Sequence, residues 1–436
     1  MGMNIRNILL FAVVFGLLVV VGYIQSWSVA FQLLNLCLIS AVMALGVNIQ
    51  WGYAGLFSVG TMGFVALGGL ATVITSMPPV HEAWAAGGAR VVLALLLAVV
   101  VIVAASQIWK RMAPGRKRNL SMIVVLVGGF FLYRYVFDPA VDAIERVNPA
   151  GTGYLGGMGL PVLVSWGVGG LLAAGVAWVI GKISLGLRSD YLAIATLGIA
   201  EIIISVIKNE DWLARGVKNV NGIPRPFSFM YEVNLQGDPW FVSWAASFGL
   251  DPVQASSWFV KLIYAALFTV VLLIILWMSE KALRSPWGRM MRAIRDNEEA
   301  AEAMGKDVTR RHLQVFILGS AVLGIAGAMM TSLDGLFTPG TYNPLRFTFL
   351  IWVMVVVGGS GNNWGAVLGG FLIWFLWVEV EPMGKHLLDF VTAWMADDSG
   401  LKKHLLESAA HMRLLTMGII LLLVLRFSPK GLIPEK

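Results

Sequence analysis

The sequence predicts an all-α integral membrane protein, a polytopic helical bundle of about ten spans plus two short or re-entrant helices. Of its 436 residues, 58% are hydrophobic and only 13% are charged, whereas soluble domains carry about 25% charged residues. Long unbroken apolar runs recur along the chain, and they exclude an outer-membrane barrel because barrel strands alternate apolar and polar residues. The backbone of such runs satisfies its hydrogen bonds in lipid by forming helices.

A helix needs about 20 apolar residues to cross a bilayer, and ten segments approach or exceed this length. They cover residues 8–24, 29–48, 52–76, 89–108, 120–137, 160–181, 190–208, 258–280, 312–333 and 411–426. Two shorter apolar pieces, 347–357 and 364–378, are joined by a glycine-rich stretch. They are either two short crossings or a re-entrant pair, and neither alternative changes the orientation of the other spans.

Basic residues lie in alternate loops and indicate the orientation. The loops on one side carry Arg6, the five basic residues of 110–118, Lys182 and Arg188, the arginines of 281–311, and Arg426 with Lys430. The positive-inside rule makes this side cytoplasmic. Both termini are therefore expected inside, and segments 209–257 and 379–410 are expected in the periplasm.

No motif in the sequence indicates catalysis, a cofactor or a metal. The chain has no G-x-x-x-x-G-K-[ST] run and therefore no phosphate-binding loop of its own. The single cysteine, Cys37, lies in an apolar run, and the five histidines are scattered. The net charge of +7 resides in short loops and does not indicate nucleic-acid binding. We expect a protein that moves a solute and is not an enzyme.

The cytoplasmic segment 281–311 is the longest charged interruption and is predicted to contain an ordered helix. Helix formers dominate from Trp287 to Met304, and Gly305 is suited to ending the helix. Arg295 and Glu299 stand four residues apart and are expected to attract each other.

One face of this predicted helix combines small and apolar side chains, those of Ala293, Ala300, Ala301 and Met304. Another protein could pack against this face. The alternative interpretation of the segment is a solvated surface helix.

The order Glu299-Ala300-Ala301-x-x-x-Gly305 resembles the EAA loop of ABC-importer permeases, which inserts into a cleft on the ATP-hydrolysing subunit. Further stretches are similar to the permease family of branched-chain amino acid ABC importers: 48–60, 187–201, 221–224, 285–298, 305–311, 326–328, 358–369 and 426–432. The resemblance covers about 29–80 and 160–436. Within the family the chain is most similar to the M-type permease, which pairs with a related H-type permease.

The resemblance implies a single permease domain over 1–436, with 1–28 and 89–150 as a subtype elaboration and 281–311 as the coupling loop. It implies a bacterial inner-membrane location. The expected partners are a second, related but different permease chain, cytoplasmic ATP-binding subunits, a periplasmic solute-binding protein and the lipid bilayer. The expected coupling residues are Arg292, Arg295, Glu298, Glu299, Ala300, Ala301, Met304 and Gly305.

Polar groups within spans are costly and so mark candidate positions for a solute path. Glu201 lies near the middle of its span, where an acidic residue costs about 2.5–3.5 kcal/mol; it serves either the path or a contact between helices. Segment 48–61 contains Gly52, Gly55 and Gly60, and broken helices at membrane depth line a cavity or are buried in protein. Further candidates are Asn48, Gln50, Tyr53, Ser58 and, in the counterpart stretch 358–363, Asn362. Close packing through the glycines is the alternative.

The predicted function is inward transport of leucine, isoleucine and valine, driven by separate ATPase subunits. One alternative is a related permease for urea or for a different amino acid. A secondary transporter driven by an ion gradient would need several membrane-embedded acids, and Glu201 is the one clear candidate. A membrane enzyme would need a clustered His, Asp or Cys constellation.

Overall fold

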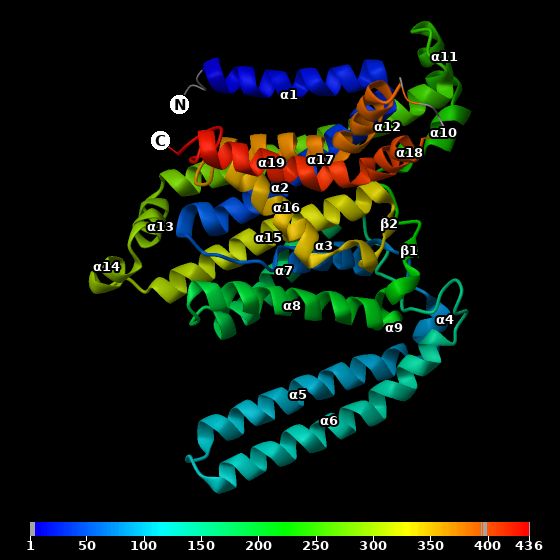
Figure 1. The fold of residues 1–436 in the computed structure, drawn as a ribbon. Coiled ribbons are helices and arrows are strands. Elements are labelled where there is room, and N and C mark those ends of the chain that lie inside the picture. Colours follow the sequence, from blue (N-terminus) through cyan, green and yellow to red (C-terminus); the bar gives the residue numbers. More distant parts are fainter. Residues whose placement is uncertain (1–4, 394, 396–398, 436) are drawn as a thin grey trace.

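The computed structural model describes residues 5–393, 395 and 399–435 and is almost entirely helical (Figure 1). Among these residues, nine helices are long and apolar enough to cross a membrane. They are α1 (Ile5–Ile24), α2 (Trp27–Val47), α5 (Ala89–Arg111), α6 (Arg116–Glu145), α7 (Val162–Ser184), α8 (Ser189–Asn209), α12 (Pro252–Arg284), α15 (Val308–Asp334) and α17 (Asn363–Val391). The predicted polytopic helical fold is confirmed.

Three shorter helices complete the bundle: α3 (Thr61–Ser76), α16 (Pro344–Gly358) and α19 (Met412–Phe427). The span predicted over 52–76 begins later than expected, at Thr61. Residues Asn48–Gly52 instead form one turn of π-helix, η1, and an irregular stretch follows in which Gly55 has a φ of +66°. The two apolar pieces around 358–363 form an antiparallel helix pair, and α17 is long enough to cross on its own.

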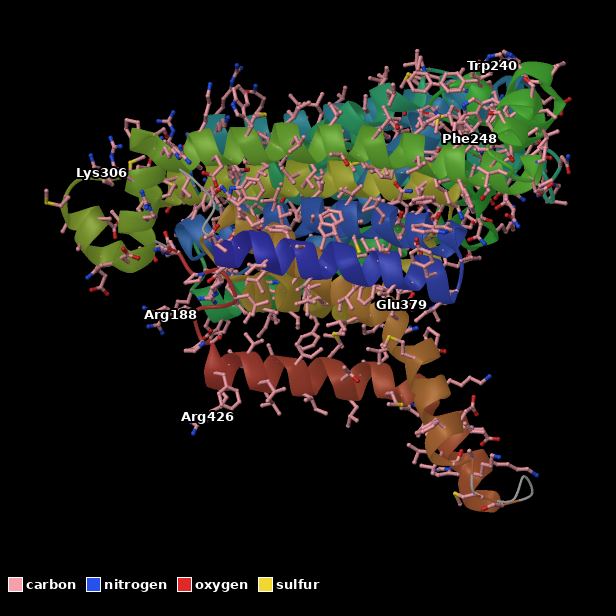
Figure 2. All side chains as sticks on the ribbon, turned by 90° about the horizontal axis from the view of Figure 1, so that it is seen from above. Arg188, Trp240, Phe248, Lys306, Glu379 and Arg426 are labelled. Atoms are coloured by element: carbon pink, nitrogen blue, oxygen red, sulfur yellow. The ribbon has the colours of Figure 1, made fainter. Side chains whose placement is uncertain are left out.

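The two ends of the bundle differ in composition, as the topology requires. One end holds α1's N-terminus, the turn between α5 and α6, helices α13 (Pro286–Asp296) and α14 (Glu298–Ala303), and the C-terminus (Figure 1). Figure 2 shows Arg188, Lys306 and Arg426 at this end and Trp240 and Phe248 at the other. Because basic residues mark the cytoplasmic side, the first end is the cytoplasmic one.

Small elements cover the outer end. They are α4 (His81–Ala83), α9 (Asp211–Ala214), α10 (Glu232–Gly237), α11 (Pro239–Ser247), the strand pair β1 (Val220–Asn221) and β2 (Leu336–Phe337), and α18 (Gly400–Glu407). Within the outer segment 379–410, α17 continues through Pro382 to Val391. A proline inside a helix removes one backbone donor, yet the helix continues past it.

Helices α5 and α6 pair with each other and stand beside the bundle (Figure 1). They join the rest of the chain through a separate buried cluster near their outer ends, which includes Val91, Phe137, Ile144 and Trp212. Most of their remaining length is exposed apolar surface. This hairpin coincides with the predicted elaboration at 89–150.

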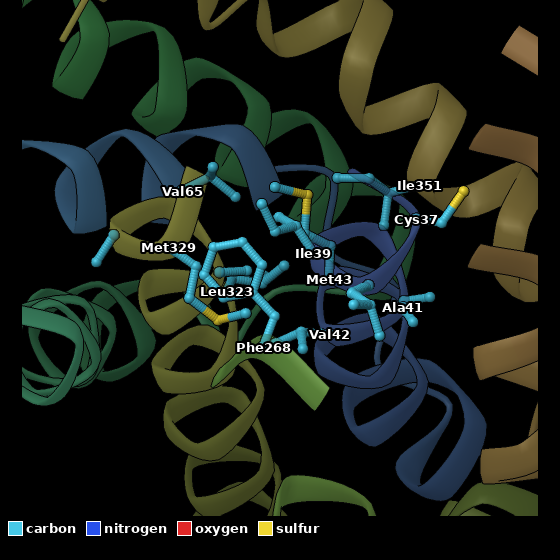
Figure 3. Packing of buried hydrophobic residues seen from close by; sticks show 14 of the residues in the cluster. Cys37, Ile39, Ala41, Val42, Met43, Val65, Phe268, Leu323, Met329 and Ile351 are labelled. Carbon is cyan, nitrogen blue, oxygen red and sulfur yellow. The ribbon is translucent and has the colours of Figure 1, made fainter. Parts of the chain in front are cut away.

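The main core lies where α15 packs against α7, α3 and α2, and part of it is drawn in Figure 3. Glycines allow these helices to approach closely, as is common in membranes. A Cβ on Gly68 of α3 would clash with the carbonyl oxygen of Gly324 on α15, and one on Gly327 would clash with the carbonyl oxygen of Val65. Cys37 lies fully buried in this core.

Candidate functional site

The cytoplasmic segment forms two short helices rather than the single helix that its composition predicts. Ser285 caps α13, and Asn297 breaks the helix with an extended backbone (φ −157°) and then caps α14, its side chain accepting from the backbone N–H of Ala300 at 2.9 Å. An asparagine at such a position satisfies an otherwise unpaired donor of the new helix. Gly305, with a φ of +75°, ends the segment as predicted.

The break creates an apolar groove of about 710 Å³ on the cytoplasmic surface. It is lined by Pro286, Trp287, Met290, Ala293, Asn297, Ala300, Ala301, Met304, Lys306 and Arg311. All four side chains of the predicted packing face therefore meet in one place. Met304 stands at its edge with 79% of its surface exposed, and Glu298 and Glu299 are exposed on the first turn of α14. An apolar groove of this kind is suited to contact with an apolar surface of another protein.

Arg295 points away from this groove and into the chain. Its Nη1 donates to the carbonyl oxygen of Gly52 at 2.6 Å and to Glu435 Oε2 at 2.7 Å. Its Nε also contacts Asp296 at 3.2 Å, so the predicted attraction to Glu299 is wrong. The helix break at Asn297 lies between the two residues and removes the four-residue geometry on which that prediction depends.

The partners of Arg295 fix its charge. Burial lowers the pKa of Arg295, but the hydrogen bonds and charges of Glu435 and Asp296 outweigh this effect, and the net pKa is raised. Arg292 lies 3.9 Å from the other carboxylate oxygen of Glu435. These residues border a second hollow, of about 930 Å³, that also reaches Trp51 and Ser360. Helix α13 thus touches both broken segments of the bundle.

The two glycine-containing stretches, 48–60 and 358–363, lie side by side and are joined by a buried polar network. Asn48 accepts from the backbone N–H of Gly361 at 2.9 Å and donates to Asn363 Oδ1 at 3.1 Å. Tyr53 donates to the same Asn363 oxygen. The Asn363 amide donates in turn to Glu280 Oε1 at 3.1 Å, at the cytoplasmic end of α12. The network therefore ties three segments together, the stretches 48–60 and 358–363 and the end of α12.

The side chains of Gln50 and Asn362 are also bonded to the protein. Gln50 donates to the carbonyl oxygen of Phe316 at 3.3 Å and to Ser320 Oγ at 3.2 Å on α15. Asn362 caps α17 and donates to the carbonyl oxygen of Pro434 at 3.1 Å. Ser58 is buried, and its hydroxyl has no hydrogen-bond partner among the described residues. Asn48, Gln50, Tyr53 and Ser58 are all at most 1% exposed, so none of them lines an open passage in this conformation. The side chains of the first three instead connect separate segments of the bundle.

Glu201 lies apart from this network, on the exposed side of α8. Tyr191, Ile194 and Gly198 share its exposed face, and a Cβ on Gly198 would meet no atom within 4 Å. Within the described part of the chain, Glu201 has no hydrogen-bond or ion-pair partner. The structure therefore does not use it as a contact between its own helices.

Sequence reasoning missed three of the residues that organise this region: Glu280, Asn363 and Glu435. Glu280 ends an apolar run and Glu435 lies in the tail, positions where charged residues are ordinary. Asn363 directly follows the candidate Asn362. The available sequence signal was a second amide side chain beside the glycine-rich turn.

Comparison with known proteins decides the family. Residues 149–425 match the family model described as the branched-chain amino acid transport system / permease component. The chain belongs to this family. The matched region begins directly after the α5–α6 hairpin of this permease, and it contains helices α13 and α14 and the stretch 358–363.

Three relatives show the same similarity. The permease is 24% identical over 323 residues to the "Probable branched-chain amino acid transport permease protein LivM" of Methanocaldococcus jannaschii, covering 73% of this chain and 80% of that protein. It is 27% identical over 271 residues to the high-affinity branched-chain amino acid permease LivM of Escherichia coli, covering 61% of this chain and 56% of the relative. A shorter match, 29% over 115 residues, joins it to the probable permease LivH of M. jannaschii and covers 26% of this chain and 35% of that protein. No solved structure matches significantly.

Proposed function

We propose that this chain is the membrane-spanning subunit of an ABC importer that carries leucine, isoleucine and valine inward across the plasma membrane of a bacterium. The observation that carries the proposal is the apolar groove between α13 and α14 at the cytoplasmic end of a permease of this family. A transport subunit without a phosphate-binding loop of its own takes its energy from a partner, and the groove is a surface on which such a partner can dock.

In this proposal the cytoplasmic ATPase subunit packs against Ala293, Ala300, Ala301 and Met304. The exposed acids Glu298 and Glu299 flank the contact and set its orientation, since charges at an interface rim contribute specificity more than affinity. Gly305 ends α14, so the helix is displaced as one short unit when its partner moves.

Arg292 and Arg295 have a different role, because they face inward. Arg295 links α13 to the Gly52 carbonyl in η1 and to Glu435. Movement of α13 therefore displaces η1. The hydrogen bond between Asn48 and Asn363 transmits this displacement to the stretch 358–363. Rearrangement of this network would free Asn48, Gln50, Tyr53, Ser58 and Asn362 to contact the solute during transport.

A second permease chain covers the exposed face of α8 in this proposal. A carboxylate in the middle of a membrane helix costs about 2.5–3.5 kcal/mol against lipid, and Glu201 has no partner within the described chain. Contact with a related subunit, or with water in the interface between the two subunits, removes the cost of exposing the Glu201 carboxylate to lipid. The similarity to both LivM and LivH proteins supports a pair of related but different chains.

The remaining proposals concern the domain boundaries, the outer segments and the substrate. Residues 1–436 form one permease domain, with 1–28 and the hairpin within 89–150 as additions to it and 281–311 as its coupling loop. The outer segments 209–257 and 379–410 receive solute from a periplasmic binding protein. The branched-chain substrate is supported by the printed functions of the LivM relatives.

The docking assignment is tested by co-purification of the tagged chain with its co-encoded ATPase subunits. Met304→Glu places a charge at the edge of the groove, and Val233→Glu is a matched control, because these side chains are 79% and 77% exposed at opposite ends of the molecule. We expect Met304→Glu to lose the ATPase subunit and ATP-driven uptake, and Val233→Glu to retain the ATPase subunit. The docking assignment would be overturned if the Met304→Glu variant co-purified with the ATPase subunit and transported as fully as the wild type.

A further inference from the structure

A small cavity on the outer side of the polar network has the chemistry of a ligand site. It measures about 300 Å³ and lies between α2, α3, α15, α16 and α17, with Arg413 of α19 at one edge. Met43, Met62, Met330 and Ile351 form much of its wall, and Met43 and Ile351 belong to the buried cluster of Figure 3. Methionine adapts to apolar ligands of varied shape.

Two buried hydrogen-bond donors at this cavity lack a partner. The indole N–H of Trp374 and the Nε–H of Arg413 are both inaccessible and without an acceptor among the described residues. Unpaired buried donors are rare, and each costs about 1–3 kcal/mol. Trp374 and Arg413 both line this apolar cavity, so a ligand in the cavity could supply the acceptor that the described residues do not.

The guanidinium of Arg413 is held in place by the protein. Its Nη2 donates to Glu381 Oε2 at 2.5 Å, and its carbon lies 5.0 Å from the ring centre of Trp377. A second guanidinium, that of Arg346, lies 4.9 Å from the same ring centre. Two guanidinium groups therefore lie against the Trp377 ring, and one of them is paired with Glu381. The positive charge that remains beside the cavity favours an anionic group.

We propose that this cavity binds the transported amino acid on its way through the membrane, a role that rests on the function proposed above. The carboxylate accepts from Arg413 Nε and Trp374 Nε1, and the branched aliphatic side chain fills the space beside Met43, Met62 and Ile351. The ammonium remains at the edge of the cavity, near Glu381. Urea has no carboxylate for the two donors and no apolar part for the methionines, so the cavity selects against it.

The position of the cavity fits a step between entry and release. Thr341, in the outer segment after β2, is exposed and borders the cavity. From there the cavity reaches Met43 near the cytoplasmic end of α2 and Met62 at the cytoplasmic start of α3. The polar network of Asn48 and Asn363 begins directly beyond that end of α2. A solute leaving the cavity inward would meet that network next.

The test uses Thr341→Cys in the permease pair purified without its binding protein. The chain's own cysteine, Cys37, is fully buried, so a charged thiol reagent reports on position 341. We expect leucine to slow the labelling and leucinol, which lacks the carboxylate, to leave it unchanged. Added Arg413→Gln should abolish the protection, whereas Arg426→Gln, at the other end of α19, should preserve it.

Uptake by the complete importer provides the second readout. Trp374→Phe removes only the indole donor, and Trp364→Phe makes the same change on α17 away from the cavity. We expect Trp374→Phe to raise the KM for leucine uptake by about 10-fold, the loss of one hydrogen bond to a charged group, and Trp364→Phe to leave KM unchanged. Wild-type ATP-driven leucine uptake with no leucine protection of position 341 and no change of KM in Trp374→Phe would overturn the site while leaving the proposed function intact.

Discussion

Arg295 gives the sharpest prediction, because it connects the coupling helix to the bundle. Arg295→Ala removes the hydrogen bonds to the Gly52 carbonyl oxygen, at 2.6 Å, and to Glu435, at 2.7 Å. A hydrogen bond to a charged group contributes about 1.5–3 kcal/mol. The Arg295 and Glu435 side chains are 24% and 26% exposed, which places both bonds at the lower end of that range. The exposed contact with Asp296 adds about 0–1 kcal/mol.

The contacts of α13 with η1 and with the C-terminal tail should therefore weaken together by about 2–4 kcal/mol, which corresponds to a factor on the order of 100 in their joint occupancy. The groove on the opposite side of α13 remains intact. We expect Arg295→Ala in proteoliposomes to bind its ATPase subunit and hydrolyse ATP normally, while the leucine imported per ATP falls at least 10-fold. Arg295→Lys should be intermediate, since one ammonium cannot reproduce the geometry of the guanidinium.

Arg289→Ala is the matched control, because Arg289 borders the same hollow and, among the described residues, its side chain bonds only the exposed carbonyl oxygen of Arg284, at 3.3 Å. It should transport as the wild type does. A double-mutant cycle of Arg295→Ala with Glu435→Gln should give a coupling energy of at least about 1 kcal/mol. Unchanged import per ATP in Arg295→Ala would refute the role of Arg295 as the link, and loss of ATPase binding would make it a docking residue.

Three further outcomes follow from packing and connectivity. Gly68→Ala should lower the thermal unfolding temperature in detergent, at a cost of about 1–3 kcal/mol, whereas Gly175→Ala, where a Cβ meets nothing within 4 Å, should not; equal temperatures would contradict the close helix approach. Tyr53→Phe removes a donor from the buried network and should destabilise the protein by about 1–3 kcal/mol in the same measurement, and an unchanged transition would show that the network adds no stability. Replacing 89–144 with a short Gly-Ser linker should leave membrane insertion and ATPase binding unchanged in a co-purification assay, and loss of either would make the hairpin part of the core permease.

The fold was predictable because membrane helices depend on length and composition. The deficit of charge and the apolar runs predicted the bundle, and the alternation of basic loops predicted its orientation. The sequence also singled out segment 48–60 and its counterpart 358–363, since both contain glycines that interrupt helices, but it did not show that they lie side by side. The break at Asn297 was not, because helix propensity in 287–304 is high on both sides and the capping side chain decides the outcome locally.

The site was less predictable because it depends on contacts between distant residues. Arg295 was expected at the ATPase surface, but its partner Glu435 lies 140 residues away in the tail. The cavity at Arg413 and Trp374 joins the start of α19 to the middle of α17, and no local pattern relates these positions. Only tertiary packing shows that both donors lack an acceptor.

The most direct measurement is leucine uptake into proteoliposomes that contain this chain, a second permease, the ATPase subunits and the binding protein. We predict accumulation of leucine that requires ATP and the binding protein and continues after sodium and proton gradients are collapsed. Uptake that persists without ATP and stops when an ion gradient is collapsed would contradict the account and make the chain a secondary transporter.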